Sequence, residues 1–194
     1  MKKNLVLLVS LFTTACFSQK IGVIAGVNNS FYTAGIGKSY YIEPSFGLQL
    51  GAFIEIDISK TVHLRPKVVY SEQGDRHRTK IEDYSTQQLN TIDYKLTYIN
   101  VPIDFKFGNK VYAIAGPQVG FLIDKKQQNL FQSSVNSNID VGFNLGGGFK
   151  VNQFFAEVGA YQGFSTMFRY YSGPSGNLVD VKNAAFKLTF GYYF

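Results

Sequence analysis

The chain of 194 residues has little cysteine, little charge and no tryptophan. Cys16 is its single cysteine, which excludes a disulfide framework and a cysteine-rich zinc site. No apolar run reaches the roughly 18 residues of a membrane-spanning helix, which excludes a helical membrane protein. Charged residues make up only 16% of the chain, against about 25% in an average soluble domain. What is abundant is glycine (19 residues), phenylalanine (18) and tyrosine (13), and this excess favours β structure.

The positive net charge does not indicate a nucleic-acid partner. The formal net charge is +6, and two of the positive charges, Lys2 and Lys3, lie at the extreme N-terminus. The other basic residues are scattered along the chain, whereas nucleic-acid binding needs a basic stripe or patch. We therefore expect no nucleic-acid partner.

Residues 1–18 have the pattern of a secretory signal peptide. Lys2 and Lys3 form a positive start, residues 5–12 are apolar, and Cys16 and Ser18 are small residues before a cut at Gln19. The segment around Cys16 also partly resembles a bacterial lipobox, which leaves lipidation of that cysteine as an alternative. We expect residues 19–194 to form the mature domain.

Apolar and polar residues alternate with a period of two in eight segments, which predicts eight β-strands. In residues 139–151, for example, Ile139, Val141 and Phe143 share one face, and Asp140 and Asn144 the other. The expected strands are 20–28, 46–58, 62–70, 95–107, 111–123, 139–151, 154–168 and 183–194.

The connections between these segments alternate in length. Short turns are expected at 59–61, 108–109 and 152–153, with Gly108 and Asn109 supplying positive φ. Long loops are expected at 29–44, 75–91, 125–138 and 169–180. Outer-membrane barrels have even strand numbers, short periplasmic turns, long external loops, an apolar outer face and a polar lumen. The sequence therefore predicts an all-β fold, an eight-stranded antiparallel up-and-down transmembrane β-barrel.

Three motifs resemble a known family. The chain ends with Phe190, Tyr192 and Phe194, similar to the C-terminal signal that the outer-membrane assembly machinery recognises. The run Tyr98-Ile99-Asn100-Val101-Pro102-Ile103, and the Gly116-Pro117 pair after it, resemble strands of Bacteroidetes outer-membrane β-barrel proteins, which include PorT-like proteins. The resemblance implies an outer-membrane location. The main expectation is a structural or interaction role, and the alternative is a narrow pore or a PorT-like component of a secretion or envelope-assembly complex.

The predicted lumen face carries five acidic and five basic side chains, which we expect to form ion pairs because isolated charges are costly in a narrow interior. An eight-stranded barrel is just wide enough for side chains to fill. A structural role for this network is our main interpretation, and a narrow gated pore is the alternative. The network comprises Glu55, Asp57, Arg65, Lys67, Asp104, Lys106, Asp140, Lys150, Glu157 and Lys187.

Enzymatic and metal chemistry have little support in the sequence. His63 is expected at the turn end of the lumen and His77 in a charged loop. Neither shows a recognisable lipid A deacylase or acyltransferase motif, and two distant histidines provide no zinc spacing. We expect no catalysis, no metal and no cofactor. A lipocalin-type soluble barrel is a further alternative, but its polar outside and apolar inside would invert the pattern seen here.

The four long loops are the expected functional surface, because binding residues usually lie on loops held by a rigid scaffold. We expect a protein or glycan partner there, in addition to outer-membrane lipid around the barrel, and we expect a monomer. The candidate contact residues are Tyr40, Tyr41, Arg76, Arg78, Phe131, Tyr170 and Tyr171.

Overall fold

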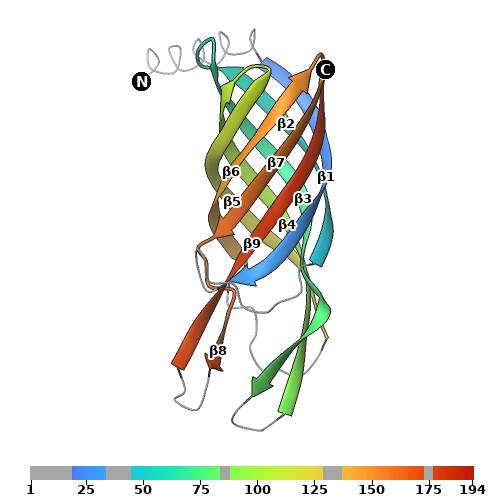
Figure 1. The fold of residues 1–194 in the computed structure, drawn as a ribbon, viewed down its shortest axis with the longest axis vertical. Helices are drawn as coiled ribbons and strands as arrows, with labels where there is room; N and C mark the ends of the chain where they lie inside the picture. Colours follow the sequence, from blue (N-terminus) through green and yellow to red (C-terminus); the bar gives the residue numbers. More distant parts are fainter. Residues whose placement is uncertain (1–18, 34–44, 84–87, 129–136, 173–176) are drawn as a thin grey trace, which may run out of the picture.

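The fold is a closed antiparallel β-barrel, described by a computed structural model for residues 19–33, 45–83, 88–128, 137–172 and 177–194. Seven consecutive strands pair with their neighbours, the seventh pairs with β9, and β9 pairs with β1 to close an eight-stranded ring (Figure 1). The strands are β1 (Gln19–Thr33), β2 (Ser45–Asp57), β3 (Val62–Asp83), β4 (Gln88–Gly108), β5 (Val111–Gln128), β6 (Ile139–Val151), β7 (Phe154–Gly163), β8 (Phe168–Ser172) and β9 (Asn177–Tyr193). The predicted eight-stranded antiparallel barrel is confirmed. Within the described residues, helices of the length and apolar character needed to cross a membrane are absent.

Alternation along each strand separates an apolar outside from a polar inside. On β6, Val141 and Leu145 are 44% and 62% exposed, whereas Asp140 and Asn144 are 2% and 6% exposed. On β9, Phe186 and Phe190 face outward, and Asn183 and Thr189 face inward. This arrangement inverts that of a soluble globular protein, and it is the one expected for strands with lipid on one side and a filled lumen on the other.

The two ends of the barrel differ (Figure 1). The short connections between β2 and β3, β4 and β5, and β6 and β7 lie at one end, where β9 also ends. We call this the turn end. At the opposite end, the loop end, the β3–β4 pair and the β8–β9 pair project beyond the ring.

The strands at the loop end are longer than the sequence pattern predicted. The expected loop 75–91 is mostly a continuation of β3 and β4, whose pairing resumes after a register shift and runs from Thr79↔Ile92 to Asp83↔Gln88. The pattern failed because a strand pair outside the membrane needs no apolar face, so its sequence resembles a polar loop.

The predicted strand 154–168 is also wrong in part, because β7 ends at Gly163. Residues 164–167 then cross the loop end, where Phe164 N–H donates to the Val141 carbonyl at 2.7 Å. Met167 N–H donates to the Val181 carbonyl at 2.7 Å, and the Met167 side chain is fully buried. The short strand β8 follows and pairs with the first residues of β9, outside the closed ring.

The turns follow the expected positions, with one change of detail. Positive φ falls on Gly108 (109°) and not on Asn109. In the next turn, Asn152 adopts φ 55°, which asparagine tolerates better than most residues. Both positions let the strands reverse direction within two residues.

Two glycines make space for aromatic rings inside the barrel. In the strand register Gly22 lies opposite Phe53, and Gly191 lies opposite Phe155. A Cβ atom at Gly22 would lie 2.4 Å from the Phe53 ring, and one at Gly191 would lie 2.1 Å from the Phe155 ring. The rings therefore occupy the volume that the missing side chains leave free.

Replacing Gly191 with alanine should destabilise the barrel. The added methyl overlaps the Phe155 ring, and overpacking of this kind typically costs about 1–3 kcal/mol. Gly159→Ala is the matched control, because its Cβ would meet nothing closer than 3.3 Å. Urea titration, read from the fraction of folded band on an unboiled SDS gel, compares the two. Equal stability of both variants would contradict this account of Gly191.

Candidate functional site

The predicted charge network lies in the barrel interior. Seven of its ten residues are buried, with relative exposure from 0% to 6%: Glu55, Arg65, Lys67, Asp104, Lys106, Asp140 and Glu157. Lys150 and Lys187 are half-buried. Asp57 lies at the turn end, with 31% of its side chain exposed.

Arg65 is the centre of this network, and its side chain is completely buried. Its Nε and Nη2 donate to Glu55 Oε2 at 3.1 and 2.8 Å. Its Nη1 pairs with Glu157 on β7, a strand on the opposite side of the barrel. Arg65 therefore ties β2, β3 and β7 together across the lumen.

Four aromatic rings surround the Arg65 guanidinium. Its Cζ lies 5.0 Å from the ring centre of Phe155, 5.3 Å from Phe53, 5.4 Å from Tyr112 and 5.9 Å from Tyr193. The hydroxyls of Tyr193 and Tyr112 donate to Glu55 Oε2 at 2.6 Å and Glu157 Oε1 at 2.9 Å. Rings over a guanidinium add cation–π attraction to the ion pairs.

The sequence pattern did not reveal these aromatic residues as part of the network. Phe53 and Phe155 are apolar residues on the otherwise polar face of their strands, so period-two alternation gave no reason to place them beside charges. In the structure each phenylalanine lies opposite a glycine on the neighbouring strand, and an aromatic ring can cover a cross-strand glycine. This pairing depends on strand register, so the sequence alone offered no signal for it.

A second layer of polar contacts lies between the Arg65 cluster and the loop end. Lys67 Nζ lies 3.0 Å from Asp104 Oδ2 and 3.2 Å from Glu157 Oε2. Lys187 Nζ donates to the side-chain oxygens of Gln118 and Asn144, both at 2.9 Å. The layer thus joins β3, β4, β5, β6, β7 and β9.

We expected the five acidic side chains to pair with the five basic ones, and the structure contains only some of these ion pairs. Among the described residues, no carboxylate lies within ion-pair distance of Lys150 or Lys187. Asp140 Oδ2 instead accepts from Asn183 Nδ2 at 3.3 Å. Amides and aromatic rings replace charged partners because strand register, which alternation does not specify, decides which side chains meet.

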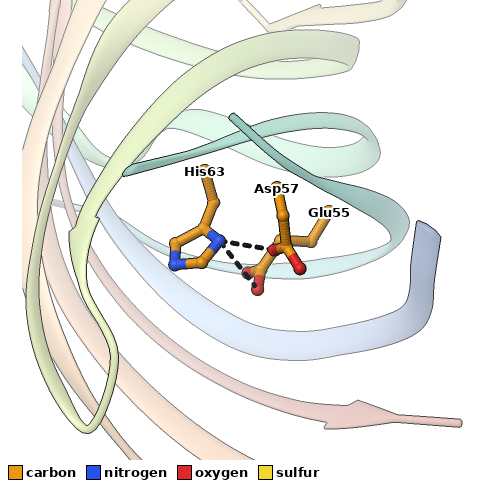
Figure 2. Close-up of side chains that lie close together, drawn as sticks. All are labelled: Glu55, Asp57 and His63. Atoms are coloured by element: carbon orange, nitrogen blue, oxygen red, sulfur yellow. Dashed lines mark hydrogen bonds and ion pairs between the residues drawn. The ribbon is translucent and has the colours of Figure 1, made fainter. Parts of the chain in front are cut away.

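Three residues at the turn end could in principle hold a metal ion (Figure 2). Glu55, Asp57 and His63 each place one ligand atom within 4.8 Å of the others. Both nitrogens of His63 are already in use, Nδ1 with Asp57 Oδ1 at 2.6 Å and Nε2 with Asn109 Oδ1 at 3.0 Å.

The carboxylates of this cluster are also neutralised by neighbouring cations. Lys20 Nζ lies 3.0 Å from Asp57 Oδ2, and Lys106 Nζ lies 3.1 Å from Glu55 Oε2, which Arg65 contacts as well. A divalent cation would have to displace these three cationic groups. The donor set therefore fits an ion-pair cluster better than a metal centre.

Side chains leave little open space in the middle of the barrel. A cavity of about 40 Å³ lies among Lys67, Asp104, Gln118 and Lys187, enough for only a few water molecules. Arg65, Phe53, Phe155 and their partners fill the next layer. Within the described residues, the lumen is a packed polar core.

The other candidate residues lie at the two ends. Phe190 and Phe194 are outward-facing at 57% and 76% exposure, and Tyr192 stacks edge-on against Phe154 and Phe194 near the turn end. The backbone places Arg76 and Arg78 on β3 and Tyr170 and Tyr171 on β8. Tyr40, Tyr41 and Phe131 lie outside the described residues, as do residues 1–18.

Solved structures of outer-membrane proteins have a similar fold. Neisserial surface protein A matches at 12% identity, covering 91% of this chain and 97% of that one, with a TM-score of 0.52. A major outer membrane protein from Thermus thermophilus matches at 14% identity, covering 91% and 100%, with a TM-score of 0.50. At these identities the similarity concerns the fold alone. No curated protein matches the chain in sequence.

The closed ring, apolar exterior and polar core define an outer-membrane β-barrel protein. Residues 17–169 match the family described as "Outer membrane protein beta-barrel domain", and the chain belongs to this family. Its location is the outer membrane, as the sequence predicted.

Proposed function

We propose that the protein is a closed outer-membrane scaffold with a structural and interaction role at its loop end, without catalysis. The observation that carries this proposal is the packed lumen, in which the buried Arg65 and its partners fill the barrel across its width. A filled barrel provides a rigid base for the segments that project from it.

The projecting strand pairs supply the interaction surface. β8 pairs only with β9 among the described residues, so one edge of this hairpin keeps unpaired backbone groups. Open strand edges are sites where another chain can add a strand. We propose a protein or glycan partner here, with Tyr170, Tyr171, Arg76 and Arg78 on these strands as contacts. Tyr40, Tyr41 and Phe131, which lie outside the described residues, are further proposed contacts.

Finer assignments extend this proposal. Residues 1–18 would direct export, and Phe190, Tyr192 and Phe194 would be recognised by the assembly machinery. A second candidate function is membership of a secretion or envelope-assembly complex, the role of PorT-like members of the Bacteroidetes barrel family that residues 98–103 resemble. In that case the loop end or the turn end would contact another component of the complex.

A bilayer experiment tests the closed scaffold. The purified protein should show a heat-modifiable mobility shift on SDS gels, as folded barrels do, and no discrete conductance steps in a planar bilayer. A sixteen-stranded porin in the same bilayer is the positive control, because barrels of that size leave an aqueous channel. Reproducible conductance steps from the folded protein would contradict the proposal and favour the narrow pore.

A further inference from the structure

The turn end of the barrel contains a recess of about 260 Å³ that the scaffold role does not require. Its walls come from several parts of the ring, among them the start of β1, the end of β4 with the turn after it, and the end of β6 with its turn. The side chains with nitrogen groups that line these walls are Lys20, His63, Lys106, Asn109, Lys110, Lys150 and Asn152.

Positive charge is in excess in this recess. Four lysine ammonium groups face it, against the carboxylates of Glu55 and, next to Glu55, Asp57. The layer immediately below does not offset the excess, because Arg65 and Lys67 there are matched by Glu157 and Asp104. The recess therefore carries two positive charges more than its acidic residues neutralise.

Two of the lysines are not used by the ion-pair network. Lys110 and Lys150 have no carboxylate within 4.0 Å among the described residues. Lys150 Nζ lies 3.9 Å from the ring centre of Tyr193, which holds the ammonium group in place without neutralising it. Lys110 is exposed in the β4–β5 turn at the mouth of the recess.

We propose that this recess binds a phosphate-class oxyanion. Lysine is a common phosphate ligand that acts as a point charge. The buried Lys106 and the half-buried Lys150 are partly desolvated, so a nearby anion stabilises them more than it would an exposed cation. The volume admits a phosphate group with a small substituent and is below the range of about 300–1,000 Å³ typical of larger-ligand pockets. The recess lies at the end of the barrel opposite the projecting hairpins, so this site is separate from the proposed interaction surface.

The phosphate group can come from a lipid headgroup of the adjacent leaflet or from a free phosphate compound. Titration of the full-length folded protein with inorganic phosphate, followed by NMR of 15N-labelled protein in a non-ionic detergent at low ionic strength, tests the shared chemistry. Chloride at the same ionic strength corrects for screening. We expect phosphate, and not chloride, to shift the amide signals of the turns around Lys110 and Lys150.

Two variants identify the site. Lys110→Gln combined with Lys150→Gln should weaken phosphate binding at least roughly tenfold, since it removes the two unpaired charges. Lys60→Gln is the matched control, because Lys60 carries the same charge at the same end but does not line the recess. Its affinity should stay within about twofold of the unmodified protein, well under the 1.4 kcal/mol of a tenfold change. Lys110→Gln alone, at an exposed turn, provides a second variant should the double variant fold poorly.

Phosphate titration in lipid nanodiscs distinguishes a lipid headgroup from a free phosphate compound as the natural ligand. Phosphate binding that is equal in detergent and in phosphatidylglycerol nanodiscs supports a free phosphate compound. Binding in detergent that is lost in the nanodiscs supports a lipid headgroup already in the recess. Absence of a phosphate-specific shift in detergent, or an unchanged affinity in both lysine variants, would overturn the proposal, whatever the result of the conductance experiment.

Discussion

Replacing Arg65 with methionine should destabilise the folded barrel by about 3–5 kcal/mol, the usual cost of breaking a buried ion pair by removing one partner. The side chain is fully buried and bonds both Glu55 and Glu157, so its loss leaves carboxylates without their main counter-charge. Methionine keeps much of the volume between the four aromatic rings, which limits the contribution of a cavity. Urea unfolding in detergent, measured by the unboiled gel band because tryptophan is absent, gives the difference in stability.

A double variant distinguishes charge from packing in this prediction. Glu157→Gln in the Arg65→Met background removes the carboxylate that has lost its arginine and keeps only Lys67 at 3.2 Å, while Glu55 keeps Lys106 at 3.1 Å. Stability should rise above that of Arg65→Met alone, because replacing both members of a buried pair costs less than removing one. A single variant as stable as the unmodified protein, to within about 1 kcal/mol, would show that the cluster does not hold the barrel together.

The sequence predicts which side chains point into the barrel, because successive side chains along a strand point to opposite faces. Asp140 and Leu145 alternate in sequence and in exposure, and Glu55, Arg65 and Glu157 all lie inside. The partners inside were not predictable. Arg65 and Glu157 are 92 positions apart, and their contact depends on register and on closure of the ring, which act over the whole chain.

Alternation of apolar and polar residues also fails to predict strands in the segments that project beyond the barrel, because no lipid contacts them there. Beyond the ring, β3 and β4 continue pairing through polar residues such as Thr79 and Lys80, with no apolar face to reveal a strand. Likewise Phe53 and Phe155 point inward although they are apolar. Their position depends on cross-strand neighbours, Gly22 and Gly191, rather than on the pattern of their own strand.

Placing an arginine at Leu145 should destabilise the protein by about 2–4 kcal/mol in a phospholipid bilayer, the cost of arginine at the lipid-facing midplane of a membrane barrel. Leu145 is the middle residue of β6 and is 62% exposed. In water an exposed leucine tolerates arginine, with changes usually within about 0.5 kcal/mol. The size of the effect therefore reports what surrounds the strand. Reversible urea unfolding in lipid vesicles measures it.

Two further positions at different depths in the membrane provide the internal control for this prediction. Ile139 and Val151 face the same side at the two ends of β6, with 47% and 58% exposure. Arginine at these positions should cost only about 0–1 kcal/mol, because the cost falls toward the interfaces. A penalty that peaks at Leu145 and falls toward both ends would locate the bilayer around the middle of the strand. Equal, small effects at all three positions would contradict a membrane-embedded outer face and favour the soluble barrel that the charge pattern argued against.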